Sequence, residues 1–198
     1  SATATAVGAH VDQSDPISAA ADLGADAVQI FLGDPQSWKA PEFRYPGGAE
    51  ALKQAAADAG VLIYVHAPYV INVASPNNRI RIPSRKALAA HVKAASQIGA
   101  AGLIVHGGHV TAGEEPALGF DNWRKAFASI DPAVPVLIEN TAGGNHAMAR
   151  RPEALAGLFA ALVDYDVGFC LDTCHAWAGG MSLPEAAGIC REITGRID

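Results

Sequence analysis

Short apolar runs alternate with helix-like patterns along the whole chain. The runs hold consecutive rather than alternating apolar residues, which indicates strands buried on both faces, as in a parallel sheet covered by helices. Regular alternation of such strands with helices is typical of the α/β class. The expected strands cover residues 5–10, 25–32, 61–66, 101–106, 134–140 and 167–172.

A helix is expected after each of these strands. The first has Ser14 and Asp15 as capping residues, Pro16 at an early position and Gly24 at its end, which are the residue types that favour helix termini. The third is expected to begin at Ser84, after a proline-containing loop. The expected helices cover residues 14–24, 47–60, 84–99, about 120–129, 151–163 and 183–195.

Two architectures fit this pattern, an open doubly wound sheet and a (β/α)₈ TIM barrel. No G-x-G-x-x-G follows the first strand, which weakens a dinucleotide-binding fold. Ionisable residues fall at the carboxyl ends of five strands, and a barrel would gather them at one mouth, where active sites of barrels lie. These residues are His10, His66, His106, Glu139 and Asp172. We therefore expect a barrel.

The length of the chain limits how much of a barrel it holds. Six strand–helix units fill the 198 residues, roughly 33 residues each, whereas eight units need about 250 residues. The sequence stops at "GRID", where a seventh strand would begin. We expect residues 1–198 to form a single partial TIM-barrel domain, with about six βα units present and the last two missing.

Mixed imidazole and carboxylate side chains at these strand ends suggest a metal site. Neutral imidazole with carboxylate suits Zn²⁺, Mn²⁺ or Fe²⁺. The candidate ligands are His66, His106, Glu139, Asp172 and His175. The alternative for the set is a rim of satisfied polar core residues. For Asp172 alone the alternative is a helix N-cap, which would not explain His175.

The remaining histidines and the cysteines carry weaker signals. His10 is interpreted as a packing residue or a support for the ligands, and His109 of "HGGH" (106–109) as a support that contacts the ligands from behind. His91 and His146 are expected on a helix surface and in a loop, with no role. Cys174 is expected to be a small packed thiol. Three cysteines without a C-x-x-C motif indicate no disulfide framework and a reducing cytosol.

Charge and hydropathy add two restrictions. The net charge of −6 counts mildly against a nucleic-acid binder, which is usually basic. A local exception is "NNRIRIPSRK" (77–86), which brings together Arg79, Arg81, Arg85 and Lys86. No apolar run is long enough to cross a bilayer and no signal peptide precedes the first strand, so a cytoplasmic protein is expected.

Five segments together resemble the endonuclease IV family of apurinic/apyrimidinic DNA-repair endonucleases. They are "GAHV" (8–11), "VHAPYVIN" (65–72), "IVHGGH" (104–109), "IENTAG" (138–143) and "CLDTCHAWAGG" (170–180), in the family's order and spacing. The resemblance implies a xylose-isomerase-like barrel and a monomeric, zinc-dependent hydrolase. The implied reaction cleaves the phosphodiester 5′ to an abasic site in double-stranded DNA and leaves a 3′-hydroxyl, as in base excision repair.

The resemblance also implies a role for each candidate ligand. Three Zn²⁺ ions are expected in a complete member, with Mn²⁺ as a possible substitute. His66 and His106 would bind the first ion, Glu139 would bridge it to a second that Asp172 also holds, and His175 would help to bind the third. Glu139 is thus the expected catalytic residue. The family's other ligands would lie beyond residue 198, so weak metal retention and little or no activity are expected if the chain ends there. If the chain is a fragment, the full-length protein is expected to be active.

DNA contacts are implied at two loops. Tyr69 and Asn72 match the loop that lies beside the flipped-out abasic nucleotide, and "GDPQSW" (33–38) matches a loop that enters the minor groove. Gln36 stands where many members carry arginine, and Trp38 follows it as a candidate to prop the vacated stack. Arg79 and Arg81 are candidates for phosphate contacts.

Two other functions stay open. The first is a sugar isomerase or epimerase on the same barrel, which would use a carboxylate-rich metal site for proton transfer at carbon. The second is an inactive fragment that binds DNA or a partner without turnover.

Overall fold

Six parallel strands form one curved sheet in the computed structural model, which describes residues 5–195. The strands lie in sequence order and every neighbouring pair is parallel. This order places the carboxyl ends of consecutive strands side by side. The strands are β1 (Gly8–His10), β2 (Ala27–Ile30), β3 (Leu62–His66), β4 (Gly102–His106), β5 (Val136–Glu139) and β6 (Val167–Cys170).

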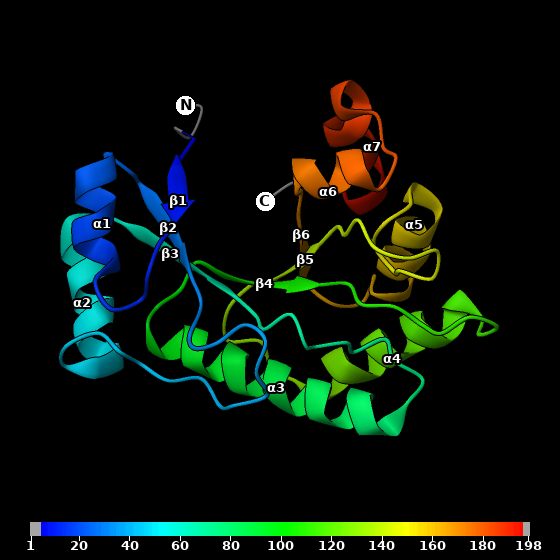
Figure 1. Ribbon diagram of the computed structural model, residues 1–198, viewed down its shortest axis with the longest axis horizontal. Helices are drawn as coiled ribbons and strands as arrows, with labels where there is room; N and C mark the ends of the chain where they lie inside the picture. Colours follow the sequence, from blue (N-terminus) through cyan, green and yellow to red (C-terminus); the bar gives the residue numbers. More distant parts are fainter. Residues whose placement is uncertain (1–4, 196–198) are drawn as a thin grey trace.

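Except for the short helix Thr173–Ala178, which follows the carboxyl end of the last strand, the helices lie along the outer side of this sheet (Figure 1), as in one part of a βα barrel. The predicted α/β class and strand order are confirmed. The helices are α1 (Pro16–Leu23), α2 (Gly48–Ala59), α3 (Asn78–Gln97), α4 (Pro116–Ser129), α5 (Pro152–Ala161), α6 (Thr173–Ala178) and α7 (Leu183–Thr194). Within residues 5–195, none of them has the length and apolar character that crossing a membrane requires.

The core lies between the sheet and this layer of helices. Leu103, Ile138 and Phe169 of neighbouring strands are fully buried there. Trp123 of α4 is also fully buried, and its Nε1 donates a hydrogen bond to the Gly107 carbonyl at 2.7 Å. A buried indole needs such a partner, and this bond fixes the loop that follows β4.

Helix α3 begins earlier than predicted. Asn77 is its N-cap and accepts a hydrogen bond from the Arg79 amide at 2.9 Å. Pro83 lies inside the helix, although proline lacks an amide proton and usually ends a helix. The predicted cap Ser84 is wrong, since this residue is buried within α3 and its Oγ accepts from the Asn72 amide at 2.8 Å.

Two further differences concern the other helices. Helix α4 begins at Pro116 instead of about residue 120, and the six-residue helix α6 was not predicted. Helix α6 has too few residues to show a helical hydrophobic period. Within "GRID", residues 196–198 lie outside the described residues.

Candidate metal centre

Three side chains that can bind a metal lie at the carboxyl ends of neighbouring strands. His66 ends β3, His106 ends β4 and Glu139 ends β5. The strand register sets His106 directly beside Glu139. The Nε2 atoms of His66 and His106 lie 2.8 Å and 3.6 Å from Glu139 Oε2. The sheet therefore brings these three predicted ligands together.

The orientation of the His66 ring fits a metal ligand. Its Nδ1 donates to the Ala67 carbonyl at 2.7 Å, a bond that leaves Nε2 directed at the Glu139 carboxylate. Both side chains are only 6% exposed. A neutral imidazole would turn a lone pair toward the carboxylate oxygen at 2.8 Å, so a proton or a cation is needed between the two atoms.

Glu139 also belongs to a second group of candidate ligands, which faces its other carboxylate oxygen. Glu139 Oε1 lies 3.1 Å from His175 Nδ1, which in turn lies 3.4 Å from Asp172 Oδ2. In each triplet the candidate ligand atoms lie within 4.8 Å of one another. The two groups form a mixed nitrogen and oxygen donor set in which Glu139 stands between two cation positions. We call His66, His106, Glu139, Asp172 and His175 the ligand cluster.

Burial also favours the neutral form of His106. Desolvation lowers its pKa below the ordinary value of 6.5, while the nearby Glu139 carboxylate acts in the opposite direction. Neutral imidazole is the form that binds metals. His106 therefore stays available as a ligand at more acidic pH than an exposed histidine would.

Local hydrogen bonds hold Asp172 in place. It is the N-cap of α6, where Oδ1 accepts from the His175 amide at 2.7 Å while Oδ2 faces the His175 ring. Asn140 pairs with the Asp172 backbone, accepting from its amide at 2.6 Å and donating to its carbonyl at 2.9 Å. One carboxylate therefore serves as both cap and candidate ligand. The role of Asn140 was missed, although its place next to Glu139 was a usable signal.

Aromatic rings cover the cluster from the side of β1 to β3. Tyr69, 44% exposed, stacks on His106 with ring centroids 5.2 Å apart and 12° between the planes. Phe31, also missed from the sequence, lies 5.5 Å from Tyr69 and 4.6 Å from His10. His10 is exposed at the end of β1, where it accepts from Gln29 at 2.9 Å, and it lies outside both ligand groups.

Asn72 and His109 join two loops beneath the cluster. Asn72 Oδ1 accepts from the His109 amide and its Nδ2 donates to the His109 carbonyl, both at 3.0 Å. Gly108 has φ +71°, and a Cβ there would lie 2.3 Å from Asn72 Oδ1. Asn72 is buried, so its amide clamps the loop after β4 to the loop after β3. We call these contacts the Asn72 clamp.

The other predicted residues lie farther from the cluster. Gln36 and Arg79 are exposed, and Trp38 is 47% exposed. Arg81 Nη1 donates to the carbonyls of Ser75 and Pro76, both at 2.9 Å. The loop expected before residue 84 was wrong over residues 78–83, because Arg79 and Arg81 belong to α3.

Two minor predictions are also wrong. His91 is 2% exposed rather than on a helix surface, because it faces the core from α3 and donates to the Ala87 carbonyl at 2.9 Å. Burial lowers its pKa. Cys174 is exposed rather than packed, and it belongs to α6, a helix that was not predicted.

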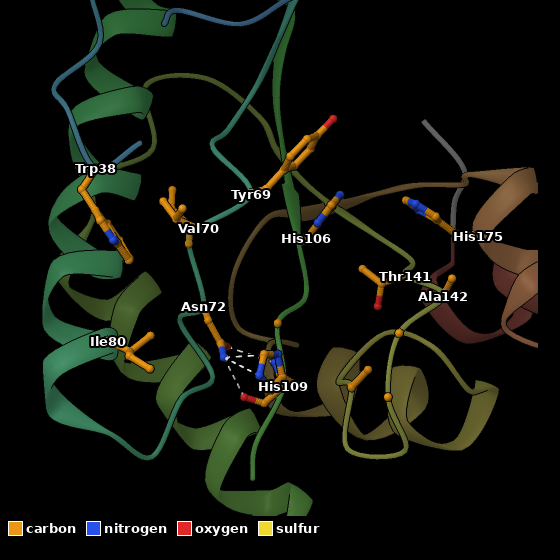
Figure 2. Close-up of a pocket in the computed structure, with 15 residues that line it drawn as sticks. Trp38, Tyr69, Val70, Asn72, Ile80, His106, His109, Thr141, Ala142 and His175 are labelled. Atoms are coloured by element: carbon orange, nitrogen blue, oxygen red, sulfur yellow. Dashed lines mark hydrogen bonds between the residues drawn. The ribbon is translucent and has the colours of Figure 1, made fainter. Parts of the chain in front are cut away.

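A cleft of about 810 Å³ adjoins the cluster and is lined by two of its members, His106 and His175, and by Tyr69 (Figure 2). The loops after β2, β3, β4 and β5 form its walls. A second cavity of about 480 Å³ lies over the cluster itself, and all five members of the cluster line it. Substrate can therefore approach the cluster from an open surface.

Fold and site together define a βα-barrel protein with a histidine–carboxylate cluster at the carboxyl ends of its strands. A family model described as a xylose isomerase-like TIM barrel matches residues 17–195, which confirms the predicted barrel type. A curated relative, "Probable endonuclease 4" of Mycobacterium bovis, is 55% identical over 97% of this chain and 74% of its own length. The chain belongs to the endonuclease IV family.

Other matches agree with this assignment. The Mycobacterium leprae protein of the same name is 53% identical, again over 97% of this chain and 74% of its own length. The crystal structure of endonuclease IV from Thermus thermophilus matches with a TM-score of 0.78 and 26% identity, over 98% of this chain and 75% of that one.

Proposed function

We propose that the chain is a metal-dependent endonuclease that hydrolyses the phosphodiester 5′ to an abasic site in double-stranded DNA and leaves a 3′-hydroxyl. The position of Glu139 carries the proposal, because its two oxygens face two separate groups of ligands. Relatives named as endonucleases support the substrate class. We further propose a monomeric, single-domain protein that acts in the cytoplasm.

The donor set fits zinc, with Mn²⁺ as a substitute. His66, His106 and Glu139 would hold one ion, Glu139 and Asp172 a second, and His175 would contribute to a third. Such ions supply charge neutralisation on the phosphate and activation of water. The chain's own part is to keep the ligands in place: the Ala67 carbonyl orients His66, and Asn140 fixes Asp172.

The exposed loops at the rim would bind the duplex. An abasic nucleotide is easily extruded because it has no base to unpair or unstack, and the open cavity over the cluster leaves room for it. Tyr69, Gln36, Trp38 and Arg79 are exposed, and we propose that the first three contact the duplex beside the abasic site and that Arg79 contacts a phosphate. For Asn72 and Arg81 we propose an indirect role toward DNA, since their side chains are bonded to neighbouring loop backbone.

A cleavage assay tests this function. A fluorescent duplex with one abasic site is incubated with zinc-supplemented protein, and an undamaged duplex and added EDTA serve as controls. We expect a single EDTA-sensitive cut 5′ to the abasic site, and its loss in Glu139→Gln. Conversion of a ketose without DNA cleavage would instead establish the sugar isomerase or epimerase alternative. DNA binding without any cleavage would establish the inactive fragment.

A further inference from the structure

Gln29 faces the cavity over the ligand cluster without belonging to the cluster. It lies on β2, level with His10 of β1 and Tyr64 of β3 in the strand register. It is partly buried and lines the cavity of about 480 Å³ together with all five ligands. Among the described residues of this lining, it alone carries a carboxamide. Gln29 is therefore placed to contact a molecule bound at the cluster.

His10 fixes the orientation of the Gln29 amide. Gln29 Nε2 donates a hydrogen bond to His10 Nδ1 at 2.9 Å, and the His10 ring packs against Phe31 with centroids 4.6 Å apart. Because the nitrogen and oxygen of an amide diverge from one carbon, this bond directs Oε1 away from His10. Within residues 5–195, no group donates a hydrogen bond to Oε1. Gln29 thus presents an oriented acceptor without a partner in the described part of the chain.

The chemistry of the substrate limits what this acceptor can bind. The phosphate oxygens of DNA are themselves acceptors, and both sugar oxygens that link a deoxynucleotide to its strand are esterified. A deoxynucleotide that keeps its base therefore has no hydroxyl group. In the closed form of an abasic nucleotide, a hydroxyl at C1′ stands where the base was attached. A site that binds this hydroxyl disfavours an analogue without it, because the acceptor is then left unpaired.

We propose that Gln29 recognises the C1′ hydroxyl of the abasic nucleotide and that His10 is the residue that positions it. The inference rests on the proposed function for the identity of the substrate, and it adds the atom by which the substrate is distinguished. Gln29 Oε1 accepts a hydrogen bond from the hydroxyl, while Nε2 stays bonded to His10. Since undamaged nucleotides lack this hydroxyl, Gln29 contributes to the selection of the damaged one.

Binding of two duplexes tests the proposal. One carries a natural abasic site, and the other carries its tetrahydrofuran analogue, in which hydrogen replaces the C1′ hydroxyl. In both, a methylene group replaces the bridging 3′ oxygen of the phosphodiester 5′ to the site, so that the duplex stays intact with zinc-supplemented protein. Affinity is measured by fluorescence anisotropy. We expect the parent chain to bind the natural site about 2- to 13-fold more tightly than the analogue, the range for one hydrogen bond.

Three substitutions assign this preference to its source. Gln29→Met keeps the length of the side chain without the amide, and it should weaken binding of the natural site to the level of the analogue. His10→Ala should reduce the preference, because Gln29 loses the bond that orients it. Gln54, exposed on α2 and bonded to Asp58, gives the matched control Gln54→Met, which should keep the full preference.

Affinity for the analogue shows whether each variant is folded, and it should stay at the parent level in all of them. An unchanged preference in Gln29→Met or His10→Ala, or equal loss of affinity for both duplexes in Gln29→Met, would overturn the proposal. So would a parent chain without any preference, including one that binds neither duplex. Failure of the parent chain to cleave an ordinary abasic-site duplex, with the preference intact, would refute the proposed function alone.

Discussion

Replacing Gly108 by alanine should loosen the loop after β4, which contains His109. Gly108 has φ +71°, where an L-residue is strained, and its new Cβ would lie 2.3 Å from Asn72 Oδ1. The two atoms cannot both stay in place, so Asn72 must give up its hydrogen bonds to the His109 backbone, both 3.0 Å long in the native loop.

The magnitude follows from these two costs. A left-handed conformation costs a non-glycine residue roughly 1–2 kcal/mol, and leaving buried polar groups unpaired costs about 1–3 kcal/mol. Gly113 is the matched control, because it has φ +89° and no atom of the described residues would lie within 4 Å of a Cβ added there. The first cost alone should therefore lower the free energy of unfolding of Gly113→Ala, whereas both costs should lower that of Gly108→Ala.

Thermal unfolding followed by circular dichroism measures the difference. For a chain of this size, about 1–3 kcal/mol corresponds to a melting temperature roughly 2–12 °C below that of Gly113→Ala. Asn72→Ala removes the side chain that a Cβ at position 108 would strike. It should therefore lower the melting temperature less in the Gly108→Ala background than in the parent chain. Equal melting temperatures for Gly108→Ala and Gly113→Ala would refute the Asn72 clamp.

Three other perturbations have defined outcomes. Asn140→Ala should weaken zinc affinity about 10–100-fold, because Asp172 loses both backbone bonds; unchanged affinity in a zinc titration would contradict this. Trp123→Phe should lower the free energy of unfolding by about 1–3 kcal/mol in urea, since the Gly107 carbonyl loses its partner. Burial holds the pKa of His91 below 6.5 in the folded state, so the unfolded chain takes up the proton first and stability should fall as pH drops below 6.5. His91→Leu should make that decline shallower between pH 6.5 and 5, and an unchanged slope of melting temperature against pH would argue against it.

The strand ends show what could be predicted from sequence. Runs such as 101–106 are apolar up to an ionisable residue, so both the buried strand and the placement of His106 followed from the sequence. The parallel order then made proximity of His66, His106 and Glu139 predictable, because neighbouring carboxyl ends share one edge.

What the sequence did not predict depends on contacts between loops. Asn72 and its hydrogen-bond partner His109 are 37 positions apart in the sequence, and no local sequence pattern predicts such a pair. Asp172 was weighed as cap or ligand, yet its two oxygens serve both purposes. Pro83 concealed the start of α3, because proline usually ends a helix but here lies inside one that begins after the cap Asn77.

Zinc content tests the central claim, that the ligand cluster built around Glu139 holds metal. The purified chain is dialysed to equilibrium against a zinc-containing buffer, and the metal bound above the buffer level is measured by mass spectrometry. We expect the parent chain and His146→Ala, which changes an exposed loop residue outside both ligand groups, to retain zinc, and Glu139→Gln and His66→Ala to lose it. Equal zinc content in all four proteins, or none in the parent chain, would contradict the account.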